Sequence, residues 1–482
     1  MKQIINLGQI NSEEVLYLDH QFLLQANANV SFRFKCEKVQ GISANICDSQ
    51  GQVRLQIIDG NQSMRYTVAR EVSQTSANGI FGELPSGEWL IEGVIFGHPG
   101  QTCELEIFVD EEDLPVHSYT SILNEQRIFD YSRLDGNDLS IPCWVKCDLH
   151  THTTLSDGAM TIEENQVQAG EMNLDFYVAT DHNICPSMWY LAENQPLVFP
   201  GVEVTSPLGH FNLLFAKDFI FNYHTLQELG NSEDLLAIIR TIKEKKMGLV
   251  SVNHPFLTIW KWLVHDLPLS LIDTIEIIND PTYKDNQAAN LQTLQFWDAL
   301  LNDGYFIPVV GGSDSHLKPD NSYEDSYYPS VIGDPGTYLY VDELKAEKLE
   351  QAIVLGHVVV TRFGFLNVTF NDWIPGDRIY PQDLPDVLSI HFDYQQEEAM
   401  KVRIELVRDG KVLKTSTDLV GEWHLTKAEL EGSYHWLRVQ IINELEGDLL
   451  GVSNPLIIGS KESQFKTWAD VLEVAPDTTP DQ

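Results

Sequence analysis

Residues 147–158 read CDLHTHTTLSDG and directly follow an apolar run at residues 141–145. Residues 150–157 of this segment carry two histidines, His150 and His152, and one carboxylate, Asp157. Imidazole nitrogens and carboxylate oxygens are common ligands of zinc, manganese and iron. Side chains two residues apart in a strand point to the same side, so a strand that ends here directs His150 and His152 toward one point. We therefore interpret the segment as a strand end that supplies the first ligands of a metal site.

The sequence around this segment alternates between strand-like and helix-like patterns. Strand-like runs occupy residues 144–149, 176–180, 198–205, 249–253, 274–278, 306–310 and 337–341. Between them, Thr161 and Glu164 have the spacing of a helix capping box, and the helical pattern at residues 287–302 stops at Gly304. About seven strand–helix units in about 230 residues indicate an α/β fold, either a barrel or an open parallel sheet.

The flanking regions have a different pattern. A chain of 482 residues exceeds the size at which a single core stops growing, so several domains are expected. Residues 1–138 show short alternating strands with turn signals and predict a β-sandwich-like domain. Residues 373–462 show the same pattern, including a hairpin signal at residues 408–411, and predict a second, small β-sandwich-like domain. The α/β unit then spans residues 139–372, and residues 463–482 read as a short helix and a loose tail.

Candidate ligands gather at the ends of the predicted α/β strands, where function gathers in both barrels and open sheets. Eight residues follow this rule, namely His150, His152, Asp157, His182, Glu203, His254, Asp314 and His316. A single catalytic zinc takes only three or four ligands, so eight candidates predict two or three ions that share Glu203. The candidate ligands are imidazoles and carboxylates, and none is a thiolate. Such a set favours manganese, zinc or iron over copper(I) or an iron–sulfur cluster.

Several neighbouring residues have an alternative interpretation. His210 begins a strand rather than ending one, and we consider it a ligand or a substrate contact. Cys147 has the opposite parity to the two histidines, so it belongs to the core. Asp148 and Asp181 are expected to accept hydrogen bonds from ligand imidazoles rather than to bind metal. A lone histidine at a strand end is more often a structural residue. Here, however, eight residues of metal-ligand type all lie at or just beyond the ends of predicted strands.

Five motifs in this order resemble the polymerase and histidinol phosphatase (PHP) superfamily of metal-dependent hydrolases. They are DLHTHTTLSDG at 148–158, ATDHN at 179–183, GVEV at 201–204, NHP at 253–255 and GGSDSH at 311–316. The resemblance covers roughly residues 143–362 and implies a distorted (βα)7 barrel. More narrowly, GVEVTSPLGHFNLL and IEIIND are similar to a branch that includes carbaryl-hydrolase-like metallohydrolases.

The resemblance also implies an assignment of ligands to ions. The first ion would take His150, His152, Glu203 and Asp314, the second would share Glu203 with His254 and His210, and the third would take Asp157, His182 and His316. A hydroxide on these ions, held by way of Glu203 and Asp314, would be the nucleophile.

Three functions remain open at this point. A phosphoesterase is the first, because phosphoester hydrolysis is the widest activity in the superfamily. The second is an amide, ester or carbamate hydrolase, and the third is a non-catalytic binding module. A phosphatase often adds a cationic clamp, for which Lys318 and Arg362 are the candidates. Trp260 and Tyr327 are candidates for contacts with an apolar part of the substrate.

The charge balance limits the possible partners. Lys and Arg number 31 against 71 Asp and Glu, which gives a formal net charge of −40 and disfavours nucleic acid and anionic membranes as partners. Residues 1–15 lack the apolar stretch of a signal peptide, and the six cysteines show no framework spacing. These features predict a cytoplasmic protein with reduced thiols and a small-molecule substrate, whose oligomeric state is left open.

Overall fold

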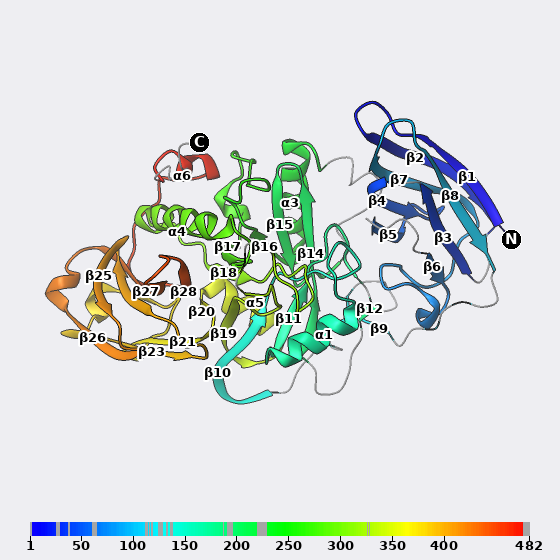
Figure 1. Cartoon of the computed structure of the whole chain (residues 1–482). Coiled ribbons are helices and arrows are strands. Elements are labelled where there is room, and N and C mark those ends of the chain that lie inside the picture. Colours follow the sequence, from blue (N-terminus) through cyan, green and yellow to red (C-terminus); the bar gives the residue numbers. More distant parts are fainter. Residues whose placement is uncertain are drawn as a thin grey trace.

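The computed structural model describes residues 2–25, 29–36, 39–59, 65–110, 114, 116, 119–123, 129–131, 134, 138–186, 188–189, 196–218, 229–324, 326 and 328–475. Figure 1 shows the strands of the first part of the chain at one end of the molecule, the mixed α/β part in the middle, and the strands of the last part at the other end.

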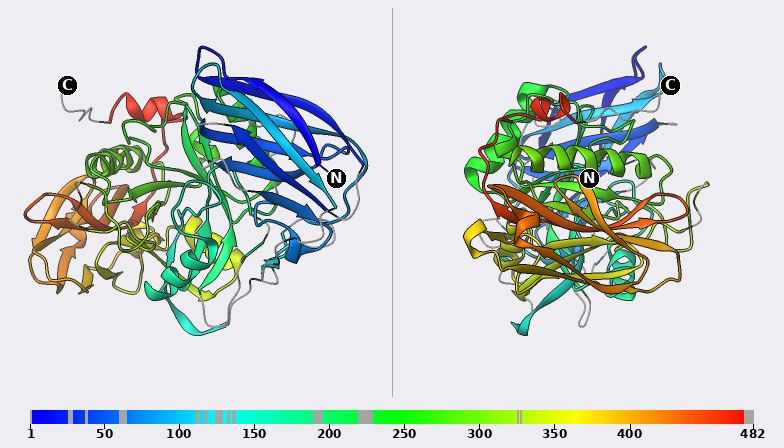
Figure 2. Two further views of the ribbon diagram at one scale, coloured as in Figure 1. Left: turned by 45° about the vertical axis from the view of Figure 1, so that its right-hand side comes forward. Right: turned by 90° about the vertical axis from the view of Figure 1, so that its left-hand side faces the viewer.

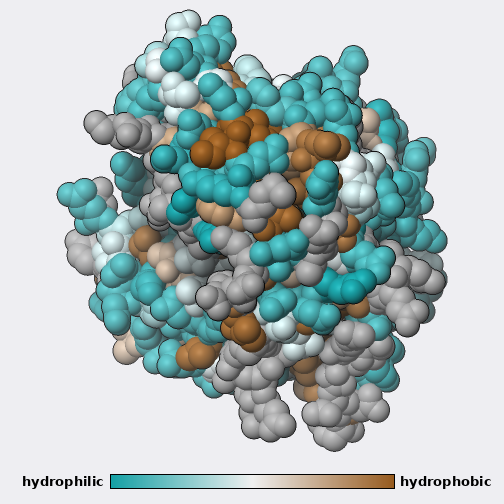
Figure 3. Space-filling model, turned by 90° about the vertical axis from the view of Figure 1, so that its right-hand side faces the viewer, coloured by the Kyte–Doolittle hydropathy of each residue, from teal (hydrophilic) through white to brown (hydrophobic). Residues whose placement is uncertain are grey.

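The first part of the chain forms two four-stranded antiparallel sheets with one shared core. The strands are β1 (Lys2–Gln9), β2 (Val15–Leu24), β3 (Asn29–Cys36), β4 (Val39–Cys47), β5 (Val53–Asp59), β6 (Tyr66–Ala69), β7 (Gly87–Gly97) and β8 (Thr102–Val109). One sheet has the order β1-β8-β3-β6, and the other has the order β2-β7-β4-β5. Phe22 and Trp89 from one sheet and Phe32 from the other lie with ring centroids 6.3–6.5 Å apart. Figure 3 shows that hydrophilic residues dominate the surface at this end of the molecule, with smaller hydrophobic areas between them.

The middle part contains two groups of strands. One group runs in the order β13 (Leu197–Pro200), β11 (Phe176–Ala179), β10 (Asp138–Asp148), β19 (Gly336–Glu343) and β20 (Val358–Thr361). The other is a sheet of β14 (Val202–Ser206), β15 (Gly209–Leu214), β16 (Leu249–Val252), β17 (Thr274–Asn279) and β18 (Val309–Gly312). The longer helices are α1 (Ile162–Glu171), α3 (Ser232–Lys245), α4 (Asn286–Asp303) and α5 (Ala346–Leu355). A short pair, β9 (Thr120–Ser121) and β12 (Met188–Trp189), lies beside this part.

The mixed α/β fold is confirmed, but the regular alternation of seven strand–helix units is not seen. Pairing is parallel for β10 with β11 and for β16 with β17, whereas β10 pairs antiparallel with β19, and β14 with β15. The described residues contain four helices of ten or more residues. The single strand predicted at residues 198–205 is divided at Gly201, where a Cβ atom would lie 2.6 Å from Val178 Cγ1. Only glycine fits this close approach, and the chain passes there from one sheet to the other.

Two helices of this part match their sequence signals. At the start of α1, Glu164 N donates to Thr161 Oγ1 and Thr161 N donates to Glu164 Oε2, so the capping box is present. Helix α4 ends at Gly304, which has a φ of 91° and accommodates the left-handed cap. No helix within the described residues is both long and apolar enough to cross a membrane.

The last part of the chain continues the sheet of the middle part. Strands β24 (Val402–Arg408), β25 (Lys411–Ser416), β27 (Tyr434–Asn443), β28 (Leu449–Ser453) and β29 (Leu456–Gly459) join it through the pairing of β28 with β20, and β29 also pairs with the short β22 (Arg378–Ile379). A separate three-stranded sheet contains β21 (Gly364–Phe370), β23 (Val387–Gln396) and β26 (Val420–Thr426). The hairpin signal is confirmed, because β24 and β25 are joined at Asp409 and Gly410, both with positive φ.

A short helix, α6 (Trp468–Leu472), follows these strands and lies beside α4 (Figure 2). The buried Trp468 ring stacks on Phe296 with centroids 4.2 Å apart. The predicted helix is therefore present, while the predicted loose end at residues 476–482 lies outside the described residues.

Candidate metal centre

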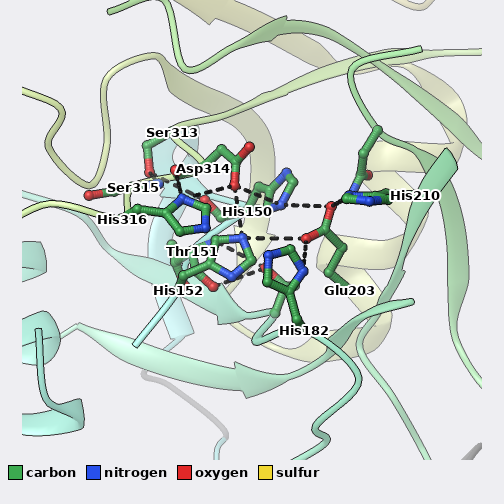
Figure 4. Close-up of polar contacts among 12 residues, drawn as sticks. His150, Thr151, His152, His182, Glu203, His210, Ser313, Asp314, Ser315 and His316 are labelled. Atoms are coloured by element: carbon green, nitrogen blue, oxygen red, sulfur yellow. Dashed lines mark hydrogen bonds and ion pairs between the residues drawn. The ribbon is translucent and has the colours of Figure 1, made fainter. Parts of the chain in front are cut away.

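Figure 4 shows seven of the candidate ligands gathered around one point, namely His150, His152, His182, Glu203, His210, Asp314 and His316. They come from β14 and β15 and from the segments that follow β10, β11 and β18. His150 and His152 lie just beyond the end of β10, and their ring centroids are 5.1 Å apart. The segment that follows β18 runs beside them, since Thr151 forms a parallel bridge with Ser315. This bridge brings Asp314 and His316 to the two histidines of the opening motif.

One set of ligand atoms consists of His150, His152, Glu203 and Asp314, which lie within 4.8 Å of one another. His150 Nε2 is 3.3 Å from Glu203 Oε1 and 3.2 Å from Asp314 Oδ1. His152 Nε2 is 3.5 Å from Glu203 Oε2 and 2.8 Å from Asp314 Oδ1. Ligands about 2.1 Å from a tetrahedral ion are about 3.4 Å from one another, so these separations fit one divalent ion.

A second set is built around the same glutamate. Glu203 Oε1 lies 3.1 Å from His210 Nδ1 and 3.4 Å from His254 Nε2, and Glu203 Oε2 lies 2.7 Å from His182 Nδ1. The tight group contains His182, Glu203 and His210. His254 is not in that group, although it approaches the same carboxylate. Glu203 therefore contacts every imidazole that would surround a second ion.

A third set lies closer to solvent and contains His152, Asp157, His182 and His316. Asp157 Oδ1 is 3.5 Å from His182 Nε2 and 3.2 Å from His316 Nε2. The side chain of Asp157 is 57% exposed, whereas the side chains of His152 and Glu203 are fully buried. The third set therefore marks the open side of the cluster, from which a substrate would enter.

The buried polar atoms of the cluster test whether it suits cations. His150 Nε2, both ring nitrogens of His152, Glu203 Oε2 and Asp314 Oδ1 are buried and lack a hydrogen bond of acceptable geometry. A buried polar atom without a partner costs free energy, so a protein keeps such atoms together only where another group satisfies them. Two or three divalent ions that bind nitrogen and oxygen would satisfy His150 Nε2, one ring nitrogen of His152 and the two carboxylate oxygens, and the residues therefore fit the cofactor that the sequence predicts.

The protonation states of the cluster also suit metal ligation. Burial, together with the neighbouring His316 and His182, lowers the pKa of His152 to about 3. Burial opposes the charged form of Glu203 and Asp314 too, but the surrounding histidines outweigh it and hold the pKa of both carboxyls well below the usual value. Near neutral pH the chain thus presents ionised carboxylates and a neutral central imidazole, the forms that bind metal.

The carboxylates raise the pKa of two other histidines. Burial would lower the pKa of His150, but Asp314, Glu203 and Glu276 outweigh it and raise this pKa well above its usual value. Burial would lower the pKa of His316, but the hydrogen bond that its ring donates to Asp157 and the charge of Asp314 outweigh burial and raise this pKa to about 10. Divalent ions would therefore compete with protons for these two imidazoles.

A carboxylate that the sequence interpretation missed orients His150. Glu276 Oε1 accepts a hydrogen bond from His150 Nδ1 at 3.0 Å, and Glu276 Oε2 accepts from the backbone N–H of His254 at 3.0 Å. Glu276 is 2% exposed and lies in the middle of the apolar strand β17. The signal was present in the sequence, because a charged residue within an otherwise apolar parallel strand requires a partner.

The expectation that Asp148 and Asp181 accept hydrogen bonds from ligand imidazoles is wrong. Asp148 accepts from the backbone N–H groups of His150, Ser313 and Gly333. Asp181 accepts from Thr153 and from the hydroxyl of Ser156. Both carboxylates therefore fix the backbone that carries the ligands. An aspartate side chain is short, so it reaches a nearby backbone N–H group more easily than the ring nitrogen of a ligand histidine. Cys147 is fully buried in the core, as predicted.

The backbone is strained at two of the candidate ligands. His254 and Asp314 have φ values of 25° and 48°, which non-glycine residues rarely adopt. Gly312 lies so close to the site that a Cβ atom would be 2.3 Å from His150 Cβ and 2.5 Å from Glu276 Oε1. Strain of this kind is often found at functional sites, where the surrounding structure maintains it.

The predicted substrate contacts lie in different places. Lys318 Nζ donates to Glu164 Oε1 at 2.7 Å, on the surface. Arg362 forms a two-pronged ion pair with Asp334, at 2.9 and 2.8 Å. Trp260 is 41% exposed, and its ring centroid lies 6.5 Å from that of His210. Tyr327 lies outside the described residues. Of the four, Trp260 thus borders the cluster, whereas Lys318 and Arg362 are engaged with carboxylates elsewhere.

Comparison with known proteins adds little. No family model matches the chain, and no curated protein matches it. A structure from Bacteroides vulgatus of a two-domain protein containing a predicted PHP-like metal-dependent phosphoesterase shares 14% identity, with a TM-score of 0.37 over 66% of this chain and 97% of that chain. The β-glucuronidases of Parabacteroides merdae and Bacteroides uniformis share 8% and 9% identity at a TM-score of 0.17, over 93% and 95% of this chain and 65% and 61% of theirs. These TM-scores are too low to support any conclusion about the fold or the function.

Proposed function

We propose that this protein is a metal-dependent hydrolase of the PHP superfamily that cleaves phosphoesters with two or three divalent ions, manganese, zinc or iron. The observation that carries the proposal is the convergence of three ligand sets that share His152, His182 and Glu203. Adjacent divalent ions are typical of sites that hold the attacking and leaving oxygens of a phosphoryl transfer. The two strand groups of the middle part would then correspond to the distorted barrel of that superfamily.

The side chains of this chain have distinct roles in the proposal. Glu203 would connect the first two ions, because both of its oxygens face imidazoles. Asp314 would join Glu203 in holding the first ion, and Glu276 keeps the ring of His150 oriented toward it. Asp157, His182 and His316 would hold the exposed ion that a substrate meets first.

Divalent ions bound here would lower the pKa of a coordinated water and neutralise the charge that develops on the phosphoryl oxygens. The chain itself excludes bulk water from the inner side of the cluster, since His150, His152 and Glu203 are all fully buried. Electrostatic interactions are stronger in such an environment than in water.

One observation favours a second candidate, hydrolysis of a carboxylic amide, ester or carbamate. Both predicted cationic clamps are engaged elsewhere, Lys318 with Glu164 and Arg362 with Asp334. An uncharged acyl substrate needs no such clamp. With a phosphoester, the ions would have to hold the charged phosphoryl group without help from a cationic side chain. With an acyl substrate, the ions would need only to polarise the carbonyl.

Hydrolysis of two substrate panels tests the proposal. Protein loaded with manganese, zinc or iron is supplied with phosphomonoesters and phosphodiesters in one panel, and with aryl esters, amides and carbamates in the other. We expect release of phosphate or alcohol from the first panel, and no release after treatment with a chelator. Turnover restricted to the acyl panel would replace the first candidate with the second, and silence on both would contradict a hydrolase.

A further inference from the structure

A hollow of about 1050 Å³ is lined by residues of the middle part and of the last part of the chain. Its lining includes residues 281–284, Arg362, Phe363, residues 399–401 and residues 445–446. We call it the distal hollow. Its volume is in the range of sites that take small organic molecules.

Consecutive residues connect the distal hollow to the metal centre. Asn279 Nδ2 lies 3.3 Å from Asp314 Oδ2, a candidate ligand, and Pro281 and Thr282 line the hollow. Consecutive Cα atoms are about 3.8 Å apart, so Asn279 and Thr282 are separated by at most about 11 Å. The lining of the hollow at Thr282 therefore begins within about 11 Å of a residue that contacts the cluster.

One aromatic ring lies between the cluster and the hollow, and three more line the hollow itself. The ring of Trp260, which lies beside His210, is 6.3 Å from that of Tyr283, a residue of the hollow. Tyr328 and Phe363 line the hollow farther along, and their ring centroids are 4.9 Å apart. Phe363 has a φ of 55°, a strained value for a bulky residue, and its carbonyl accepts hydrogen bonds from the Tyr394 hydroxyl and from the backbone N–H of Glu397.

The charges in the distal hollow differ from those of the chain as a whole. Lys284, Lys401 and Arg362 face Glu446 and Asp448 in the hollow, whereas the whole sequence has 31 basic and 71 acidic residues. Neither lysine has an ion-pair partner among the residues that the structure describes. Burial and the neighbouring Glu446 also raise the pKa of Asp448 to about 6, which reduces its negative charge in mildly acidic solution. An anionic group is thus repelled less here than elsewhere on the surface.

We infer that the distal hollow binds the leaving-group end of the substrate, an aromatic ring system that carries a carboxylate or another anionic group. The aromatic walls provide stacking surfaces for the rings, and the two unpaired lysines attract the anion. The inference rests on the proposed hydrolase function, since it places the bond to be cleaved at the metal centre and the aromatic anion in the hollow.

Calorimetric titration with para-biphenylcarboxylate tests this inference without any turnover. We expect the wild type to bind this probe, and the double variant Lys284→Ala/Lys401→Ala to bind it roughly fivefold to tenfold more weakly, with a smaller difference at high salt. Lys348→Ala is the matched control, because Lys348 is an exposed lysine on α5, outside the hollow, and its binding should equal that of the wild type. Biphenylmethanol, which lacks the charge, should bind both proteins equally.

Two results would overturn the inference, namely no binding of the carboxylate by the wild type, or equal binding by the wild type and the double variant. Failure of the proposed function would look different, because para-biphenylcarboxylate would still bind while metal-loaded protein hydrolysed neither substrate panel. If phosphoesters are hydrolysed, a phosphate ester of hydroxybiphenylcarboxylate should have a KM several-fold below that of phenyl phosphate in the wild type only. Equal KM values for the two esters in the wild type would count against the hollow as a leaving-group site.

Discussion

Replacing His152 with alanine is expected to lower kcat/KM of the metal-loaded protein by more than a factor of about 100. Loss of a group that only supports a ligand lowers metal affinity or activity by about 10–100-fold. His152 belongs to two of the three ligand sets, and both of its ring nitrogens are buried without a hydrogen bond. Its loss therefore removes a fully buried ligand from the centre of the cluster. Steady-state kinetics on whichever panel the wild type hydrolyses, together with metal analysis, provide the measurement.

His357→Ala is the control for this variant. His357 lies outside the cluster, and its Nε2 atom is within hydrogen-bond distance of Asp377 Oδ1, at 3.2 Å. The His357→Ala variant should retain the kinetic constants and the metal content of the wild type. Circular dichroism of both variants separates a lost ligand from a lost fold. Activity of the His152→Ala variant within a few-fold of the wild type would show that His152 is no ligand of the reactive ions.

Glu276→Gln is expected to weaken metal binding and to lower kcat by about 10–100-fold, the range found when a group that orients a ligand is removed. The Glu276 carboxylate accepts hydrogen bonds from His150 Nδ1, the His254 backbone N–H and Asn279 Nδ2. A glutamine keeps only one acceptor oxygen, so its amide group would face at least one donor. The metal dissociation constant, measured by competition with a chelating dye, should rise while the thermal unfolding of the apoprotein changes little.

Glu405→Gln is a matched control, because Glu405 is another buried glutamate, 4% exposed, that accepts hydrogen bonds from Arg403 and Gln440 on the last sheet. Its metal dissociation constant should equal that of the wild type. If Glu276→Gln and Glu405→Gln bind metal equally well, Glu276 has no positioning role.

The sequence predicted the elements of the fold better than their arrangement. The capping box at Thr161 and the end of α4 at Gly304 depend on neighbours within a few residues, so a local pattern was sufficient. Whether two strands pair parallel or antiparallel, and which strands pair, depends on residues that are far apart in the sequence. The antiparallel pairing of β10 with β19 and the continuation of the sheet from β20 into β28 left no local signal. Neither pairing was predicted.

The candidate site could be predicted for a physical reason. Strand ends collect at one side of an α/β unit, so polar residues at those ends are neighbours even when they are far apart in sequence. The structure places all nine predicted ligands, from His150 to His316, in one cluster, and their role as ligands stays a prediction. Two features were beyond the reach of this rule. Glu276 lies within a strand rather than at its end, and the partners of Lys318 and Arg362 depend on packing.

The most direct test of a multi-ion hydrolase is the metal content of the protein, measured by mass spectrometry after loading with manganese, zinc or iron and removal of free ions, beside its hydrolytic activity. The account predicts two or three equivalents of divalent ion per chain, loss of both metal and activity on chelation, and recovery of both when the ion is restored. Fewer than two equivalents per chain, or hydrolysis that persists after the metal has been removed, would contradict it.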